Sequence, residues 1–158
     1  MTLKLTTAAV GILGVLATTP LTGAYAGECP QGQIAANAMA PGATMPQGVT
    51  DEVISSIDLS SKGADWKGSM LRMRKLVVEP GGVVPWHSHE MRPANILIAE
   101  GSITEYRSTC KVPIEHKAGD VTAEFGALSH WWKNNGTSPA VLYSADILTS
   151  VSQEHESM

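Results

Sequence analysis

Residues 81–101 read G-G-V-V-P-W-H-S-H-E-M-R-P-A-N-I-L-I-A-E-G, and the expected fold and chemistry of the chain depend on this stretch. It contains His87 and His89, separated by one residue. Side chains of an extended strand alternate between its two faces, so both imidazoles should point to the same side and could bind one ion. The Gly-Gly pair and Pro85 before them predict a turn, which places the imidazoles near the start of a strand.

A second stretch supplies a third histidine. Residues 119–134 read G-D-V-T-A-E-F-G-A-L-S-H-W-W-K-N and include His130. Three imidazoles that meet inside a β barrel would form a neutral nitrogen site for a divalent first-row transition ion. Positions would remain open for water, dioxygen or substrate, because a closed structural site needs a fourth protein ligand. The remaining histidines, His116 and His155, are interpreted as surface or hydrogen-bonded residues.

The first 26 residues have the features of a secretory signal peptide. Lys4 provides a basic start, residues 8–17 are apolar, and Ala24-Tyr25-Ala26 provides a small-residue cleavage site. The apolar run is shorter than the roughly 20 residues that span a bilayer, although an uncleaved membrane anchor is the alternative. We therefore expect a periplasmic or secreted protein with no membrane contact after cleavage.

Cleavage after residue 26 would leave 132 residues, which is enough for one domain. The formal charge of −4 would become −5, because Lys4 lies in the removed segment and no acidic residue does. No cluster of basic residues is present, so the sequence gives no indication of nucleic-acid binding.

The chain contains two cysteines, Cys29 just after the expected cleavage site and Cys110 near the middle of the mature chain. In an oxidising compartment this pair is expected to form a disulfide that pins the N-terminal arm to the domain. The alternative is two free thiols. Their spacing does not match a redox motif or a zinc motif.

The sequence after the arm is a series of short β-strand patterns separated by turn residues. We expect an N-terminal arm over residues 27–50, a β domain over residues 51–150 and a polar tail over residues 151–158. Many short strands with few helix signals predict an all-β sandwich or barrel. Two hairpins are expected, one between residues 95–100 and 103–108, and one with Asn135-Gly136 as its turn, between residues 130–133 and 141–148.

Residues 71–147 resemble a small single-domain cupin of the exported bacterial type. The first cupin motif begins with a glycine that is followed, after five residues, by His-x-His, and Gly81, His87 and His89 match it. The motif ends with a glycine, which Gly101 matches.

The second cupin motif matches in part. Gly119, His130 and Asn134 correspond to its glycine, histidine and asparagine. Phe125 and Ala127 stand where the family has proline and glycine.

The resemblance implies a jelly-roll β barrel that holds its ion on His87, His89 and His130. One departure concerns the carboxylate ligand of the first motif, because Ala94 stands at its position. Glu90 is a poor substitute, since it follows His89 directly and should point to the opposite face. Glu105 is a further candidate, one strand away.

Five residues are candidates for the walls of a substrate pocket: Trp86, Arg92, Asn95, Tyr106 and Trp132. Trp132 lies two residues after His130 and should share its face. The two tryptophans could form an aromatic wall, and filling the core explains them equally well. Arg92 could bind a substrate carboxylate, or could be a solvated loop charge. Asn95 and Tyr106 could hydrogen-bond a ligand, with the same alternative.

The first functional hypothesis is an exported metal-dependent dioxygenase or related oxidoreductase acting on a small organic substrate. Thiol and diketone dioxygenases among the cupins are similar in using three histidines on iron, so iron is the favoured ion, and manganese, zinc, nickel and copper remain open. The alternative is a non-catalytic cupin that binds a small ligand or stores a metal. A metal-free sugar epimerase would need a histidine–carboxylate base arrangement that the sequence does not reveal. The expected partners are a small-molecule ligand and, by resemblance, a second copy in a homodimer.

Overall fold

The computed structural model describes residues 27–149. The expected signal peptide at 1–26, the polar tail at 151–158, residue 150 and His155 lie outside the described residues. The described elements are strands and two short 3-10 turns: β1 Gln47–Asp58, η1 Ser60–Lys62, η2 Ala64–Trp66, β2 Met70–Ser88, β3 Ala94–Glu100, β4 Ser102–Arg107, β5 Ile114–Lys117, β6 Val121–Glu124, β7 Ser129–Lys133 and β8 Ala140–Leu148.

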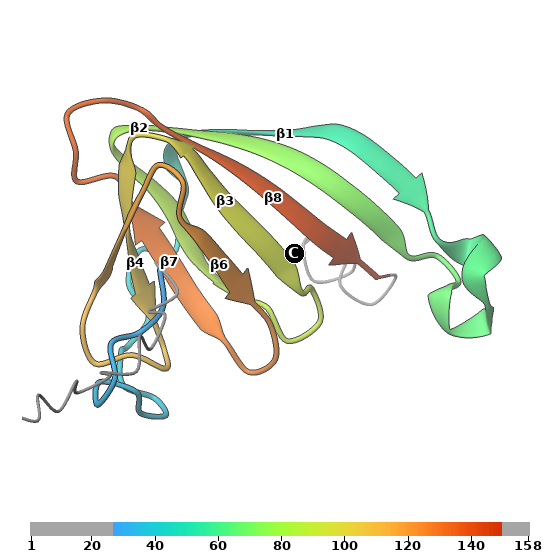
Figure 1. The fold of residues 1–158 in the computed structure, drawn as a ribbon, viewed down its shortest axis with the longest axis horizontal. Helices are drawn as coiled ribbons and strands as arrows, with labels where there is room; N and C mark the ends of the chain where they lie inside the picture. Colours follow the sequence, from blue (N-terminus) through green and yellow to red (C-terminus); the bar gives the residue numbers. More distant parts are fainter. Residues whose placement is uncertain (1–26, 150–158) are drawn as a thin grey trace, which may run out of the picture.

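The strands form one antiparallel sheet that curls into a barrel-like shape, so the predicted all-β class is confirmed (Figure 1). The strand order is β5-β4-β7-β2-β8-β3-β6, and β1 pairs with β2 beside this path. The long strand β2 organises the sheet. Its first part, from Met70 to Val78, pairs with β8, and its last part, from Val83 to Ser88, pairs with β7.

Both hairpin predictions were wrong. Strand β3 pairs with β6 and β8, whereas β4 pairs with β5 and β7, so the chain changes neighbours at Gly101. Gly101 has a φ of 73°, and a Cβ added there would lie 2.5 Å from the Pro139 carbonyl oxygen, so a close approach of two backbones requires this glycine. Strands β7 and β8 are not paired either, because each pairs with a different part of β2.

The interior of the curled sheet is apolar at one end and polar toward the other. Along β8 every second residue is buried, in the order Ala140, Leu142, Ser144, Asp146, Leu148. The apolar cluster is made of Leu76, Val78, Ala94, Ile96, Ile98, Ile103, Trp132, Ala140 and Leu142. Period-two alternation therefore builds a core and, next to it, a layer of buried polar groups.

Strands β1 and β2 form a two-stranded ribbon whose far end, with η1 and η2, projects beyond the rest of the sheet (Figure 1). All residues of β1 except Val49 are exposed. The predicted boundary between arm and domain, after residue 50, falls inside this strand. In the described part of the chain, no helix is long and apolar enough to cross a membrane.

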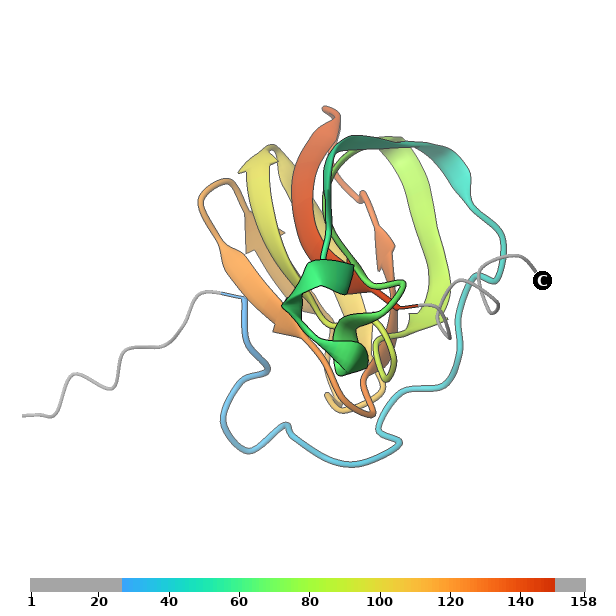
Figure 2. The same cartoon turned by 90° about the vertical axis from the view of Figure 1, so that its right-hand side faces the viewer.

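The N-terminal arm before β1 runs along one end of the barrel (blue to cyan in Figure 2). Its backbone is bonded to the segment after β4: the Ala38 N–H donates to the Ser108 carbonyl at 2.7 Å, and the Lys111 N–H donates to the Gln33 carbonyl at 2.9 Å. The predicted disulfide between Cys29 and Cys110 is formed. The arm is therefore fixed to the domain both covalently and by backbone hydrogen bonds.

Candidate metal centre

Pairing between β2 and β7 brings the distant histidines together. His87 and His130 are direct cross-strand partners in this antiparallel pair. His89 lies just beyond the end of β2, where its backbone N–H donates to the Leu128 carbonyl at 2.8 Å. The imidazoles of His89 and His130 are buried, and that of His87 is half-buried. The two stretches singled out in the sequence thus meet at one point, as the resemblance to cupins implied.

The three rings face one another through their Nε2 atoms. The Nε2 atom of His87 lies 2.9 Å from that of His89 and 3.2 Å from that of His130. The ring centroids are 4.6 to 4.8 Å apart. Nitrogens at this spacing can contact one ion placed between them, since metal–nitrogen bonds are about 2.0–2.1 Å long.

Hydrogen bonds on the outer side assign the tautomer of each ring. Each Nδ1 faces an oxygen that only accepts: the Pro85 carbonyl for His87 at 2.8 Å, the Arg92 carbonyl for His89 at 2.8 Å, and the Glu105 carboxylate for His130. Each Nδ1 therefore carries the proton, and each Nε2 points a lone pair into the site. Three converging lone pairs repel one another unless a cation or a proton lies between them.

A carboxylate that the sequence interpretation missed completes the group. Glu124, at the end of β6, has Oε2 3.0 Å from the His89 Nε2 and Oε1 3.5 Å from the His130 Nε2. One ligand atom from each of His87, His89, Glu124 and His130 lies within 4.8 Å of the others. The Oε1 atom is buried and accepts no hydrogen bond among the described residues. The sequence interpretation considered Glu90 and Glu105 as replacements for the carboxylate missing at Ala94 and did not include Glu124.

The electrostatics of the site favour neutral imidazoles. Burial lowers the pKa of His89 to about 3, helped by the neighbouring His130. Burial and the two neighbouring histidines hold the pKa of His87 well below its usual value. Burial raises the pKa of Glu124 to about 7. His87 and His89 are therefore in the protonation state of a metal ligand. The donor set of three nitrogens and one carboxylate fits a divalent transition metal.

The other carboxylates and the fourth described histidine have different roles. Glu105 is buried but contacts the outer Nδ1 of His130 and not the centre of the site, so it is not part of the ligand group. Glu90 is exposed, as expected. His116 is buried and its Nε2 donates to Glu105 at 2.9 Å, which agrees with its interpretation as a hydrogen-bonded residue.

Comparison with known proteins agrees with the fold. Residues 74–146 match the family described as Cupin domain. The chain contains a cupin domain. No curated protein matches the sequence significantly.

Two solved structures are similar to this cupin domain. One is a predicted oxalate decarboxylase from Thermotoga maritima, with 19% identity, a TM-score of 0.53, and coverage of 73% of this chain and 97% of that chain. The other is the Cnp3 cupin domain of Schizosaccharomyces pombe, with 14% identity, a TM-score of 0.52, and coverage of 70% of this chain and 72% of that chain. At these identities the likeness concerns the fold alone.

A cavity of about 440 Å³ opens beside the histidines of the cupin domain. This volume lies in the range of small-molecule sites. Its apolar walls come from Val49, Leu76, Val84, Ile96, Trp132 and Leu142. Of the five predicted pocket residues, Arg92 and Trp132 line the cavity, whereas Trp86, Asn95 and Tyr106 do not. Tyr106 stacks on Trp131 at a centroid distance of 4.0 Å, and Asn95 is exposed, because strand alternation turns both away from the buried face.

The cavity also has a charged side. Arg74 and Asp51 line it and form an ion pair with each other. Behind them, the buried Asp146 accepts hydrogen bonds from Arg72 at 2.7 and 2.9 Å, from Arg74 at 3.1 Å and from Arg92 at 3.2 Å. This ion-pair cluster was not evident from the sequence, because its members lie far apart along the chain.

Proposed function

We propose that the protein is an exported cupin metalloenzyme that uses a divalent transition ion, with iron favoured, for oxidoreductase chemistry on a small organic substrate. The observation that carries this proposal is the convergence of three Nε2 lone pairs on one point, beside a buried carboxylate and next to an apolar cavity. His87, His89, Glu124 and His130 would hold the ion.

The arrangement is unfavourable without a cation or a bound proton. Burial removes the water that would otherwise hydrate the nitrogen lone pairs and the Glu124 oxygens, and each unsatisfied buried polar group costs about 1–3 kcal/mol. A divalent cation satisfies all four groups at once. The single negative charge of Glu124 would offset half of the charge of such an ion.

Four protein ligands leave room for substrate, because iron and manganese commonly take six ligands. When bound, such an ion supplies Lewis-acid activation and electron transfer. The protein would contribute the surroundings of the ion. Leu76, Ile96 and Trp132 form an apolar wall beside the histidines, and Arg92 places a positive charge at the charged side of the cavity. This combination favours a substrate with an apolar body and a metal-binding oxygen group.

The identity of the ion is proposed from the donor set. Imidazole and carboxylate ligands suit iron and manganese, and they also accept zinc, nickel and copper, so occupancy depends on availability in the compartment. The structurally similar Thermotoga maritima protein is a predicted oxalate decarboxylase, which is a reason to include small carboxylic acids among the candidate substrates.

Export is part of the proposal. The first 26 residues read as a signal peptide, and a disulfide such as that between Cys29 and Cys110 persists in oxidising compartments. Purification of the full-length gene product from the exported fraction, followed by mass determination, tests cleavage after Ala26.

Elemental analysis of that material tests the metal site, and oxygen consumption with a panel of thiols, diketones and small carboxylic acids tests the enzyme. We expect a stoichiometric ion in the wild type, none in His87→Ala or His130→Ala, and retention at reduced affinity in His116→Ala, because His116 is not a ligand but donates to Glu105 behind His130. A stoichiometric ion without turnover on any substrate would favour the non-catalytic alternative. Absence of a bound ion, with no uptake of added iron or manganese, would overturn the metal site itself.

A further inference from the structure

A buried charged cluster lies directly behind His130, on the side away from the cavity. Its centre is Glu105, on β4, whose side chain is fully buried. One carboxylate oxygen accepts from the His130 Nδ1–H and from the Arg107 Nε at 2.6 Å, and the other accepts from the His116 Nε2 at 2.9 Å. Burial would raise the pKa of Glu105, but the hydrogen bonds from His116 and His130 and the charge of Arg107 hold it well below its usual value. Glu105 is therefore an ionised carboxylate inside the barrel.

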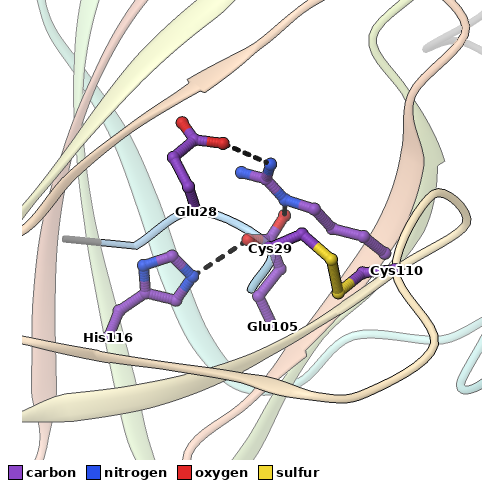
Figure 3. The surroundings of a disulfide bond; sticks show 6 residues. Glu28, Cys29, Glu105, Cys110 and His116 are labelled. Carbon is purple, nitrogen blue, oxygen red and sulfur yellow. Dashed lines mark hydrogen bonds and ion pairs between the residues drawn. A yellow bond between two sulfur atoms is a disulfide. The ribbon is translucent and has the colours of Figure 1, made fainter. Parts of the chain in front are cut away.

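The N-terminal arm covers this cluster from outside. Arg107 bonds to Thr122 and also forms an ion pair with Glu28 at 3.4 Å. Glu28 immediately precedes Cys29, and Cys110 lies three residues after Arg107. The disulfide therefore keeps the backbone of Glu28 close to that of Arg107, its ion-pair partner. Figure 3 shows Glu28 and His116 near Glu105, with a dashed line from His116 to the Glu105 carboxylate and the Cys29–Cys110 disulfide close by.

The arm also touches His116. Gly27 has a φ of 93°, and a Cβ added there would lie 2.7 Å from the His116 Nδ1. Only glycine therefore fits this close approach without displacing the ring. The arm thus contacts two of the three groups that hold Glu105, namely Arg107 and His116.

We propose that Glu105 is a positioning residue for His130, and that the disulfide-anchored arm, residues 27–46, holds Glu105 in place and thereby raises the affinity of the site for its metal. This inference rests on the proposed metal function. A carboxylate bonded to the outer nitrogen of a ligating histidine fixes the tautomer and the ring orientation, and it increases the basicity of the inner nitrogen. His130 is distinct here, because His87 and His89 donate to neutral backbone carbonyls.

A purely structural role for Glu105 makes a different prediction. Loss of a buried charge partner would then lower stability and leave metal affinity unchanged in the folded protein. The affinity for Co²⁺, measured by competition with a chelator at a temperature where each variant is folded, separates the two roles.

The first test is Glu105→Gln. The amide has one accepting oxygen and no charge, so His130, His116 and Arg107 cannot all keep their acceptor. We expect the dissociation constant for Co²⁺ to rise by about 10- to 100-fold. Nitrogen NMR of the metal-free variant should also show His130 as a mixture of tautomers. The matched control is Asp120→Asn, which changes another buried carboxylate that accepts a backbone N–H, from Lys117, and does not contact the histidines. It should bind Co²⁺ as the wild type does.

The second test leaves the barrel interior intact. The combination Glu28→Gln with Cys29→Ser removes the covalent and ionic attachments of the arm next to Arg107. We expect it to weaken Co²⁺ binding by several-fold in the wild-type background and much less in the Glu105→Gln background. Unchanged affinity in the folded Glu105→Gln variant would overturn the positioning role, and equal losses in both backgrounds would overturn the coupling to the arm. A wild type that binds no Co²⁺ would instead count against the proposed function.

Discussion

Ala94 and Glu124 are direct cross-strand partners, one at the start of β3 and the other at the end of β6. Ala94 occupies the position where the first cupin motif has its glutamate. Cross-strand partners have Cβ atoms about 4.5–5.5 Å apart, so a carboxylate on either strand can reach nearly the same point. In this protein the acidic ligand comes from the neighbouring strand.

This pairing predicts that a glutamate at position 94 can replace Glu124 as a metal ligand. Glu124→Ala should weaken Mn²⁺ binding by at least about 100-fold, since changes to residues that only support metal ligands cost 10- to 100-fold. Adding Ala94→Glu to that variant should recover a substantial part of the loss. Titration with Mn²⁺ against a chelator gives the comparison, with Glu90→Ala as the control because Glu90 is exposed. If a folded double variant showed no recovery of Mn²⁺ affinity, a carboxylate at position 94 could not replace the one at position 124.

Metal binding should release a proton. Burial raises the pKa of Glu124 to about 7, so the carboxyl group is protonated in much of the metal-free protein below that pH, whereas it must be ionised to bind a cation. His89, with a pKa lowered to about 3, is already neutral and contributes no proton. Affinity should therefore rise as the pH increases from about 6 to 8. Calorimetry in buffers of different ionisation enthalpy measures the protons released, and Glu124→Gln should release fewer. Equal release by both proteins would contradict the assignment.

The same shift predicts how the metal-free protein responds to pH. The folded-state pKa of Glu124 lies above its ordinary value of 4.5, so the native state binds the proton more tightly than the unfolded state does. Its contribution to stability is complete below pH 4.5 and is lost as the pH rises toward 7. In urea unfolding, Glu124→Gln should remove this loss. A wild type and variant with parallel pH profiles between pH 4.5 and 7 would show that Glu124 titrates normally.

Parts of the site followed from sequence because they depend on local periodicity. His87 and His89 share a face for that reason, and Trp132 lines the cavity next to His130 for the same reason. The fold class followed from the density of strand and turn patterns. Glu124 could not be found in this way, because its place beside the histidines depends on the register of β3 against β6. The local pattern gave the opposite signal, because residues 121–124 alternate apolar Val121 and Ala123 with polar Thr122 and Glu124, whereas in the structure Thr122 and Glu124 are the buried pair.

The hairpin errors have a similar origin. Asn135-Gly136 favours a tight turn, but β7 and β8 each find a partner along the long strand β2. Asn134, just before this turn, is bonded to β2. Its side-chain amide donates to the carbonyls of Val78 and Ser138 at 2.8 Å, and its backbone forms hydrogen bonds with Gly81 and Gly82. Long-range pairing therefore outweighed local turn propensity.

The cluster around Asp146 should stabilise the protein at neutral pH and lose this effect in acid. Burial alone would raise the pKa of Asp146, but hydrogen bonds and charge from Arg72, and the charges of Arg74 and Arg92, hold it below the ordinary value of 3.8. Asp146→Asn should cost roughly 3 kcal/mol at pH 7, because it leaves partly buried arginines without their partner. The difference from the wild type should persist near pH 3.8 and vanish only as the pH falls through the lowered folded-state pKa, where the native wild-type carboxylate is protonated too. Urea unfolding of the wild type and Asp146→Asn, at pH 7 and in acid, measures this difference in stability. A cost that persists in acid would indicate a packing defect instead.

The disulfide should contribute more to stability than any single hydrogen bond of the arm. It joins residues 81 positions apart, and closing a loop of that length in the unfolded chain is worth about 4.5 kcal/mol. The double variant Cys29→Ser with Cys110→Ser should therefore unfold at a lower urea concentration, with a Tm lower by roughly 10–20 °C. Wild type treated with a reductant should match the double variant, and the double variant itself should not respond to the reductant. The strands contain every residue of the apolar cluster and do not depend on the arm for their pairing, so the circular dichroism of the β domain should be retained below the transition. Equal Tm values for oxidised and reduced wild type would show that backbone bonds such as that between Ala38 and Ser108 are enough to hold the arm.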